Sequence, residues 1–197
     1  MIAFTFNDIE VGARLAEALV RQATSLRGMP IVYGDLLTLA RSLHPKDEVL
    51  ARAVPVGIGP KLLFVEGFCA SYGLPNLACL AVNRETLRPR SGYAGDWEAD
   101  RRAVAGFDWS AAVAPLAAYV DAMRAKVPAR IKPRKERPAD VAWYAYFCSH
   151  RAACEKLTPE DKQEIINQMM AGLDPETALG RVLAAKQEFG SAPAAQV

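Results

Sequence analysis

The sequence predicts a mostly helical α+β protein with a winged-helix-like core and a C-terminal helical appendage. Three observations predict this class. Residues 28–95 show signals in the order strand, turn, helix, helix, strand and loop. A basic, proline-containing segment follows at residues 126–138, and helix-start signals recur after it. The chain of 197 residues suits one domain of moderate size plus a small addition, and it can bury a substantial core.

The first element is a helix that we expect to run to about Leu26. Asn7 and Glu10 form the residue pair typical of a capping box at a helix start. Apolar residues spaced by three or four positions then mark one face of the helix, and Gly28 ends it. Before this helix, residues 1–6 are apolar and aromatic, which favours a short strand.

The central region is expected to alternate short strands and helices, because apolar runs of different length are separated by Gly, Pro and Asp. In chain order we expect a strand at 31–33, helices at 35–43, 46–54 and 61–72, a strand at 77–82 and a short return strand starting at Gly92. The P-V-G-I-G-P run at residues 55–60 is expected to form a loop.

The rest of the chain is expected to be helical. Residues 97–127 fit two helices divided near Gly106, with Ser110 as a second cap. Three more helices are expected over 139–157, from Thr158 to Ala171 and from Asp174 to about Phe189. The predicted organisation is therefore a winged-helix-like domain with flanking helices at 1–125, a basic linker at 126–138 and a small helical unit at 139–190.

Composition excludes several classes of protein. With 24 Lys and Arg against 22 Asp and Glu, the whole-chain charge gives no footprint for nucleic acid or for a membrane. There is no run of eighteen apolar residues and no secretory signal pattern, so we expect a cytoplasmic protein, bacterial or from a mobile element, with no membrane partner. The four cysteines lack paired C-x-x-C spacing and are expected to be reduced, buried small hydrophobes.

Three blocks of sequence carry a resemblance to a known family. They read P-I-V-Y-G-D-L-L at 30–37, A-R-A-V at 51–54 and L-P-N-L-A-C-L-A-V-N-R-E-T-L-R-P-R-S-G-Y at 74–93. In this order they resemble the DNA-binding domain of the alkylguanine DNA alkyltransferases and the alkyltransferase-like proteins. That family has a Tyr-Gly turn, an Arg-Ala-Val-Gly recognition helix and a Pro-Cys-His-Arg active site. Here Asn76 follows Pro75, so the resemblance implies DNA binding without alkyl transfer.

The resemblance implies roles for two residues. Tyr33 would lie beside a DNA phosphate, and Arg52 would prop open the base stack where a nucleotide has been rotated out. The alternatives are that Tyr33 packs on the domain surface and that Arg52 is a solvated arginine. The helix at 61–72 is a second candidate for the recognition position, with Lys61 as an exposed cation and few other base-reading residues.

Two basic segments are candidates for phosphate contacts. Arg84, Arg88 and Arg90 lie in the loop after the strand at 77–82, where a wing would meet a duplex. Residues 126–137 hold six basic residues and one acidic residue, and Lys132, Arg134 and Lys135 are the ones we select. The alternatives are a solvated hairpin tip and a soluble hinge.

No catalytic or metal-binding pattern is evident. Cys79 lies in an apolar run with no histidine near it, which predicts a buried thiol without nucleophilic activation. Cys148, His150 and Cys154 have spacings that do not place three zinc ligands on one helical face. We therefore expect no cofactor, no metal and no enzymatic activity.

The sequence thus favours a non-enzymatic nucleic-acid-binding protein with DNA as its partner. The alternative is a protein-interaction module, such as a phage or plasmid factor that binds and inhibits a host defence complex. A fold-level resemblance does not decide between them, because function depends on the site.

Overall fold

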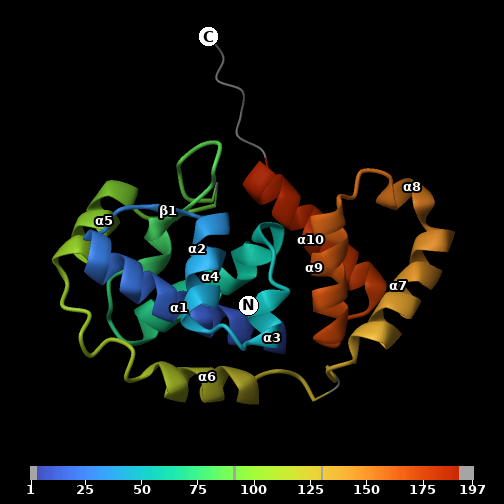
Figure 1. Ribbon diagram of the computed structural model, residues 1–197, viewed down its shortest axis with the longest axis horizontal. Helices are drawn as coiled ribbons and strands as arrows, with labels where there is room; N and C mark the ends of the chain where they lie inside the picture. The colour runs from blue at the N-terminus through green and yellow to red at the C-terminus, as the bar shows by residue number, and fades with distance from the viewer. Residues whose placement is uncertain (1–3, 91, 130, 191–197) are drawn as a thin grey trace, which may run out of the picture.

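A computed structural model describes residues 4–90, 92–129 and 131–190. It is 66% helix and 2% strand, which confirms the mostly helical class. The α-helices, shown in Figure 1, are α1 (Phe6–Leu26), α2 (Tyr33–Leu43), α3 (Glu48–Ala51), α4 (Ile58–Ser71), α5 (Trp97–Gly106), α6 (Leu116–Ala125), α7 (Glu136–Ser149), α8 (Arg151–Cys154), α9 (Pro159–Met170) and α10 (Pro175–Gly190).

Two short strands form a small parallel sheet. In β1 (Ile31–Val32) and β2 (Ala81–Val82), Ile31 lies opposite Ala81 and Val32 lies opposite Val82. The two segments that we expected to share a sheet therefore do so, over two residues each. The expectation of a return strand starting at Gly92 is wrong, because Gly92 lies in a turn and the residue after it has no regular secondary structure.

Helix α1 begins earlier than the sequence indicated. Its N-cap is Thr5, whose hydroxyl accepts a hydrogen bond from the Asp8 backbone N–H at 3.2 Å, while the Asp8 carboxylate accepts from the Thr5 N–H at 3.0 Å. The capping box is thus Thr5–Asp8 and not Asn7–Glu10. The strand expected at residues 1–6 is not formed at residues 4–6, and residues 1–3 lie outside the described part of the chain.

Helix α1 runs through the centre of the larger apolar cluster and packs closely on α4. A Cβ at Gly12 would lie 2.7 Å from a ring carbon of Phe64, so this position needs glycine for the close approach. The cluster includes fully buried residues of α1, α2 and α4, together with the buried Tyr119 of α6.

Two central segments differ from the expected secondary structure. The run expected as a strand at 77–82 begins as a 3-10 helix, η2 (Leu77–Leu80), because the Asn76 side chain accepts a hydrogen bond from the Ala78 N–H at 3.1 Å and turns the chain. The segment expected as a loop at 55–60 forms the 3-10 helix η1 (Pro55–Gly57) and the start of α4. Pro60 fits this first turn because no backbone donor is needed there.

The starts of three other helices agree with the sequence signals to different degrees. Thr158 caps α9 as expected, with its hydroxyl accepting from the Asp161 N–H at 3.2 Å. The helix expected at 46–54 is shortened to α3, which Asp47 caps. Ser110 does not cap α6, whose N-cap is Pro115.

The C-terminal helices α7, α9 and α10 surround a second, smaller apolar cluster. Its buried members include Trp143, Ile165, Met169 and Val182. Figure 1 shows these helices on one side of the molecule, α1 to α5 on the other, and α6 with the segment that follows it running along one edge. Helix α7 begins at Glu136, within the expected linker.

A cluster of buried charges joins the two sets of helices. The ammonium of Lys61 lies 2.8 Å from Glu164 Oε1 and 3.7 Å from Asp8 Oδ1. Arg181 of α10 lies 2.8 Å from Asp8 Oδ2. Burial alone would raise the pKa of Asp8, but Lys61 and Arg181 outweigh it and hold that pKa below its ordinary value. The C-terminal helices are therefore fixed to α1 and α4 by paired charges.

Candidate functional site

Two of the residues predicted to contact nucleic acid are buried. Lys61 is 1% exposed and its ammonium also donates to the Gly57 carbonyl at 2.7 Å, so the expectation of an exposed cation is wrong. Lys61 is buried because it lies on the face of α4 that contacts Glu164 of α9. Tyr33 is 6% exposed and packs in the larger apolar cluster.

The three arginines of the loop after β2 differ in their partners. Arg90 pairs with Glu66 at 3.3 Å and its side chain is 14% exposed. The Arg88 guanidinium lies 4.6 Å from the centre of the Trp97 ring, in a cation–π contact. Arg84 is highly exposed and lies 4.0 Å from Asp35. Each of the three therefore has an intramolecular partner.

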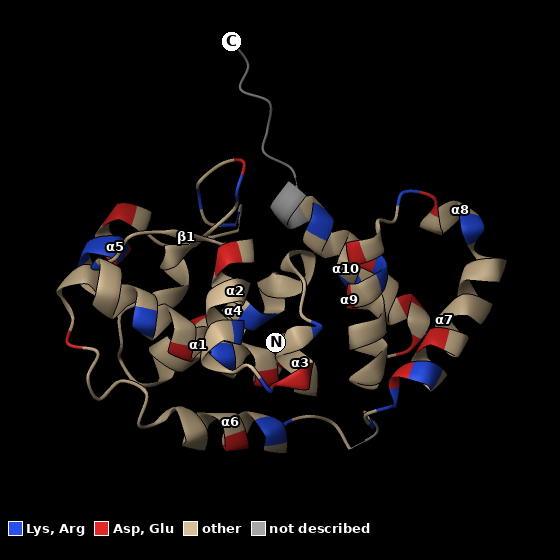
Figure 2. Ribbon diagram, in the orientation of Figure 1, with Lys and Arg blue, Asp and Glu red and all other residues tan. Residues whose placement is uncertain are grey.

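The segment between α6 and α7 presents its cations differently. Lys132, Arg134 and Lys135 are exposed, and none has an ion-pair partner among the residues that the structure describes. Figure 2 shows basic residues along this connection at the lower edge of the view, while the loop after β2 lies at the upper edge. The two basic segments thus do not form one continuous surface.

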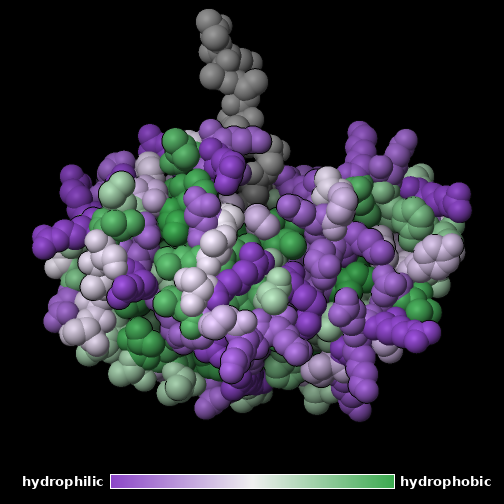
Figure 3. Space-filling view, in the orientation of Figure 1, coloured by the Kyte–Doolittle hydropathy of each residue, from purple (hydrophilic) through white to green (hydrophobic). Residues whose placement is uncertain are grey.

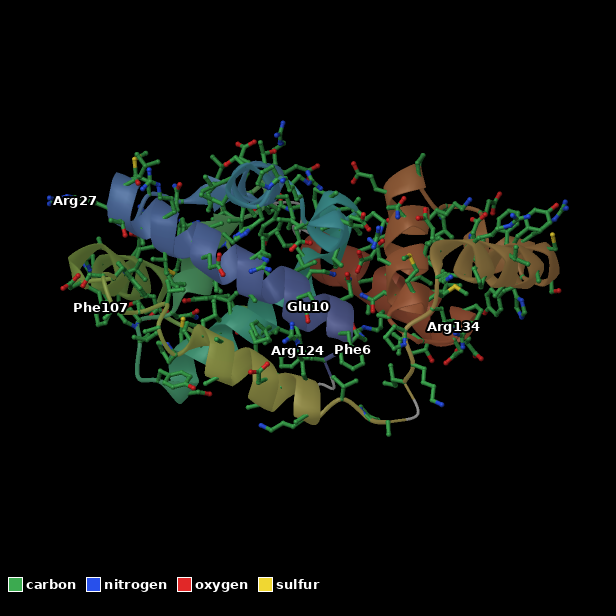
Figure 4. All side chains as sticks on the ribbon, turned by 60° about the horizontal axis from the view of Figure 1, so that its bottom comes forward. Phe6, Glu10, Arg27, Phe107, Arg124 and Arg134 are labelled. Atoms are coloured by element: carbon green, nitrogen blue, oxygen red, sulfur yellow. The ribbon has the colours of Figure 1, made fainter. Side chains whose placement is uncertain are left out.

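Arg52 and Arg134 meet at a pocket between the two sets of helices. The pocket has a volume of about 210 Å³. Its lining residues come from the start of α1, from the region of α3, from the connecting segment and from α9: Phe6, Asn7, Glu10, Val49, Arg52, Pro133, Arg134, Asn167, Met170 and Ala171. Figure 4 shows Phe6 and Glu10 at the end of α1 that faces Arg134, and Arg27 at the opposite end.

Backbone contacts fix the positions of both arginines. The Arg52 carbonyl accepts a hydrogen bond from Asn167 Nδ2 at 2.9 Å, and the Arg134 N–H donates to the Met170 carbonyl at 2.7 Å. Both contacts are to α9. Neither guanidinium has a hydrogen-bond or ion-pair partner in the described part of the chain. Helix α9 therefore holds two residues that are far apart in the sequence beside the same pocket.

Polar groups of α1 complete the pocket. Asn7 is 9% exposed, and its Nδ2 has no hydrogen-bond partner among the described residues. Glu10 is paired with Arg124 through contacts of 2.6 to 2.8 Å. The side chain of Arg124 thus compensates the charge of the one carboxylate that lines the pocket.

Asn76 stands where the resembled family has its active-site cysteine, and here this residue has a structural role. Asn76 Nδ2 donates to the Tyr93 hydroxyl at 3.3 Å, and that hydroxyl donates to the Asp100 carboxylate. Burial and this bond to Asp100 raise the pKa of Tyr93 far above its ordinary value. Burial raises the pKa of the Cys79 thiol to about 12, so Cys79 is protonated near neutral pH and lacks nucleophilic character.

A second, larger concavity lies on the C-terminal helices. It has a volume of about 970 Å³, and its lining includes Trp143, Phe147 and Leu157 together with Arg151 and Lys162. Figure 3 shows that hydrophobic residues on the viewed face of the molecule form separate patches between hydrophilic ones.

The described residues contain no group of three or more His, Cys, Asp or Glu side chains arranged to hold a metal ion. Within the same part of the chain, no helix combines the length and the apolar character needed to cross a membrane.

Comparison of the chain with protein-family models, with curated proteins and with solved structures gives no match in any of the three. The function must therefore be argued from the site itself.

Sequence reasoning selected Arg52 and Arg134 separately, and the structure brings them together. It missed Asn7 and Asn167 as pocket residues, because both carry ordinary helix signals: Asn7 fits a helix start and Asn167 lies within a helix. No local pattern could have placed them beside the same pocket, since the packing of α9 on α1 and α4 is a long-range contact.

Proposed function

We propose that this protein is a non-enzymatic nucleic-acid-binding protein that contacts the phosphate backbone of DNA through the segment between α6 and α7. Residues 28–95 would form the winged-helix-like unit that the resemblance implies. The observation that carries the proposal is a set of exposed cations without ion-pair partners among the described residues: Lys126, Lys132 and Lys135 on the connecting segment, and Arg137 in the first turn of α7.

An exposed cation without a partner gains a phosphate contact and releases counterions, with no internal ion pair to break. Such contacts position a protein on a duplex without reading its sequence. The loop after β2 is a weaker candidate, since Arg88 and Arg90 would first have to leave Trp97 and Glu66.

The test is the salt dependence of binding to a short fluorescent DNA duplex between about 50 and 200 mM salt. The variant K126Q/K132Q/K135Q removes three cations from the connecting segment. We expect weaker binding to all sequences alike. The slope of log K against log salt should be flatter by about 0.9 for each phosphate that the variant no longer neutralises.

The matched control is R21Q/R27Q/R102Q, which removes three exposed cations from α1, its C-terminal end and α5. It makes the same change in net charge and should leave the slope close to that of the unaltered protein. Equal weakening of binding in the two variants would show that only net charge matters. Failure of the unaltered protein to bind DNA at low salt would refute the proposal.

The second candidate function is a protein-interaction module, such as a factor that inhibits a host defence complex. The concavity lined by Trp143, Phe147 and Leu157 favours it, and Tyr144 on the same helix is 68% exposed. Under this alternative, DNA binding is absent at low salt, and one host protein is retained by the immobilised protein after nuclease treatment. These two results together would replace the first proposal with the second.

A further inference from the structure

The pocket between α1 and α9 has the properties of a binding site for a small anion. Arg52 and Arg134 both line it, and their guanidinium groups have no hydrogen-bond or ion-pair partner in the described residues. Guanidinium groups bind carboxylate and phosphate oxygens through paired hydrogen bonds. Two of them at one small pocket supply more donors than a single anionic head group needs.

Asn7 gives a second and independent indication. Asn7 is 9% exposed and lines the pocket, yet its buried Nδ2 has no hydrogen-bond partner among the described residues. A buried donor without a partner destabilises a folded protein, and native structures contain few of them. An acceptor oxygen in the pocket would satisfy this donor.

The position of Asn7 on α1 adds to the effect. Phe6 and Asn7 are the first two residues of a helix of 21 residues, whose N-terminal end carries partial positive charge. Asp8, at the same end, does not line the pocket and is already compensated by Lys61 and Arg181. Glu10 is compensated by Arg124.

The remaining walls determine the body of the ligand. Phe6, Val49 and Met170 supply apolar surface, and the volume of about 210 Å³ admits only a small organic molecule. We propose that this pocket binds a small ligand that carries a phosphate or carboxylate head group on a compact, planar or apolar body. The head group contacts Arg52, Arg134 and Asn7, and the body packs against Phe6 and Met170.

Two kinds of ligand have this chemistry: a free small molecule and the phosphorylated end of a nucleic-acid strand. Both present one anionic group beside a planar body. The test of this site is independent of the DNA backbone contacts proposed above, because its small-molecule probes contain no nucleic acid.

The test uses isothermal titration calorimetry on the full chain with phenyl phosphate, benzoate and benzamide. Benzamide has nearly the shape of benzoate and no charge. We expect the two anions to bind and benzamide to show no heat of binding. Substitution R52M or N7D should weaken binding of the anions by about tenfold or more, since each removes a charge-assisted or buried hydrogen bond.

The variants are chosen so that folding does not decide the outcome. An acidic residue is favourable in the first turn of a helix, so N7D is expected to keep the melting temperature while placing a negative charge at the pocket. R134M, at an exposed position, provides a further test should N7D unfold. R27Q, at the other end of α1 in Figure 4, is the charge-matched control and should bind as the unaltered protein does.

Binding of benzamide as strong as that of benzoate would overturn the proposal, as would full affinity in R52M, R134M and N7D together. A single-stranded oligonucleotide with a 5′-phosphate, compared with its 5′-hydroxyl form, identifies the source. A preference for the phosphorylated strand that R52M removes assigns the pocket to strand ends. Binding of phenyl phosphate without such a preference assigns it to a free small molecule.

Discussion

The loop after β2 and the segment between α6 and α7 are both rich in basic residues, but they differ in the intramolecular partners of those residues. In the loop, Arg90 pairs with Glu66 and Arg88 stacks on Trp97. In the connecting segment, Lys132 and Lys135 have no partner among the described residues. A run of basic residues in a sequence therefore indicates where cations are, and only the neighbouring elements determine whether they are available to a ligand.

The difference arises from what surrounds each segment. The loop folds back between α4 and α5, which supply Glu66 and Trp97. The connecting segment crosses between two sets of helices and has no regular secondary structure at 131–135, where its basic side chains reach solvent. The first arrangement uses cations to hold the fold, and the second leaves them for an external anion.

Lys61 is the most strongly partnered cation and should give the largest effect on stability. We expect K61M to lower the free energy of unfolding by about 3 to 5 kcal/mol, because Glu164 would lose its buried partner and Asp8 would lose one of its two. Urea denaturation followed by tryptophan fluorescence measures this change. K135M, in the connecting segment, should change stability by less than about 0.5 kcal/mol.

The effect of K61M should also depend on pH. The pKa of Asp8 in the folded protein lies below its ordinary value of 3.8, since Lys61 and Arg181 outweigh burial. Its charge therefore stabilises the fold above that pH, and the contribution is lost as the pH falls through the lower folded-state pKa. The difference in unfolding free energy between the unaltered protein and K61M should therefore become smaller at acidic pH. A difference that stays constant with pH would contradict the role assigned to Asp8.

Arg90 should show an intermediate effect. R90A leaves Glu66 without its partner at 3.3 Å in a partly buried setting, so we expect a loss of about 1 to 2 kcal/mol in unfolding free energy. R137A removes an exposed arginine from the first turn of α7, directly after the connecting segment, and should have almost no effect on stability. If the two variants were equally stable, the distinction between the two basic segments would fail.

Arg88 should show the smallest effect. R88A removes the contact with Trp97, which is worth about 0.5 to 1 kcal/mol at an exposed site, and Arg101 still lies 4.9 Å from the same ring. A small fall in melting temperature with a red shift of the Trp97 emission is expected. R84A, in the same loop, is the control, and a shift of equal size there would exclude a specific contact with Trp97.

Signals confined to a few consecutive residues were the most predictable. Thr158 was correctly identified as a helix cap because its hydroxyl and the Asp161 N–H are three residues apart. The same kind of signal misplaced the start of α1, where two overlapping pairs fit the pattern. The chain takes an extended conformation at Thr5, which makes Thr5 the cap and leaves Asn7 inside the helix.

Contacts between distant residues were not predictable. An apolar run such as Leu77–Val82 suits a strand, and only the side chain of Asn76 turns its first half into a 3-10 helix. Lys61 looked exposed because its anion, Glu164, is 103 residues away in the sequence. The pocket depends on the same long-range packing, so Arg52 and Arg134 could be selected individually but their meeting could not.

The separation between Lys61 and Glu164 has a consequence for how the chain is made. Glu164 follows Lys61 by 103 residues, and at about 5 to 20 residues per second a ribosome needs roughly 5 to 20 seconds to synthesise them. During that time the surface of α4 that will be buried carries a cation whose main counter-charge does not yet exist. The burial of Lys61 with its partner thus awaits α9, and shortened chains that end before α9 would keep this charged surface open to water and to chaperones.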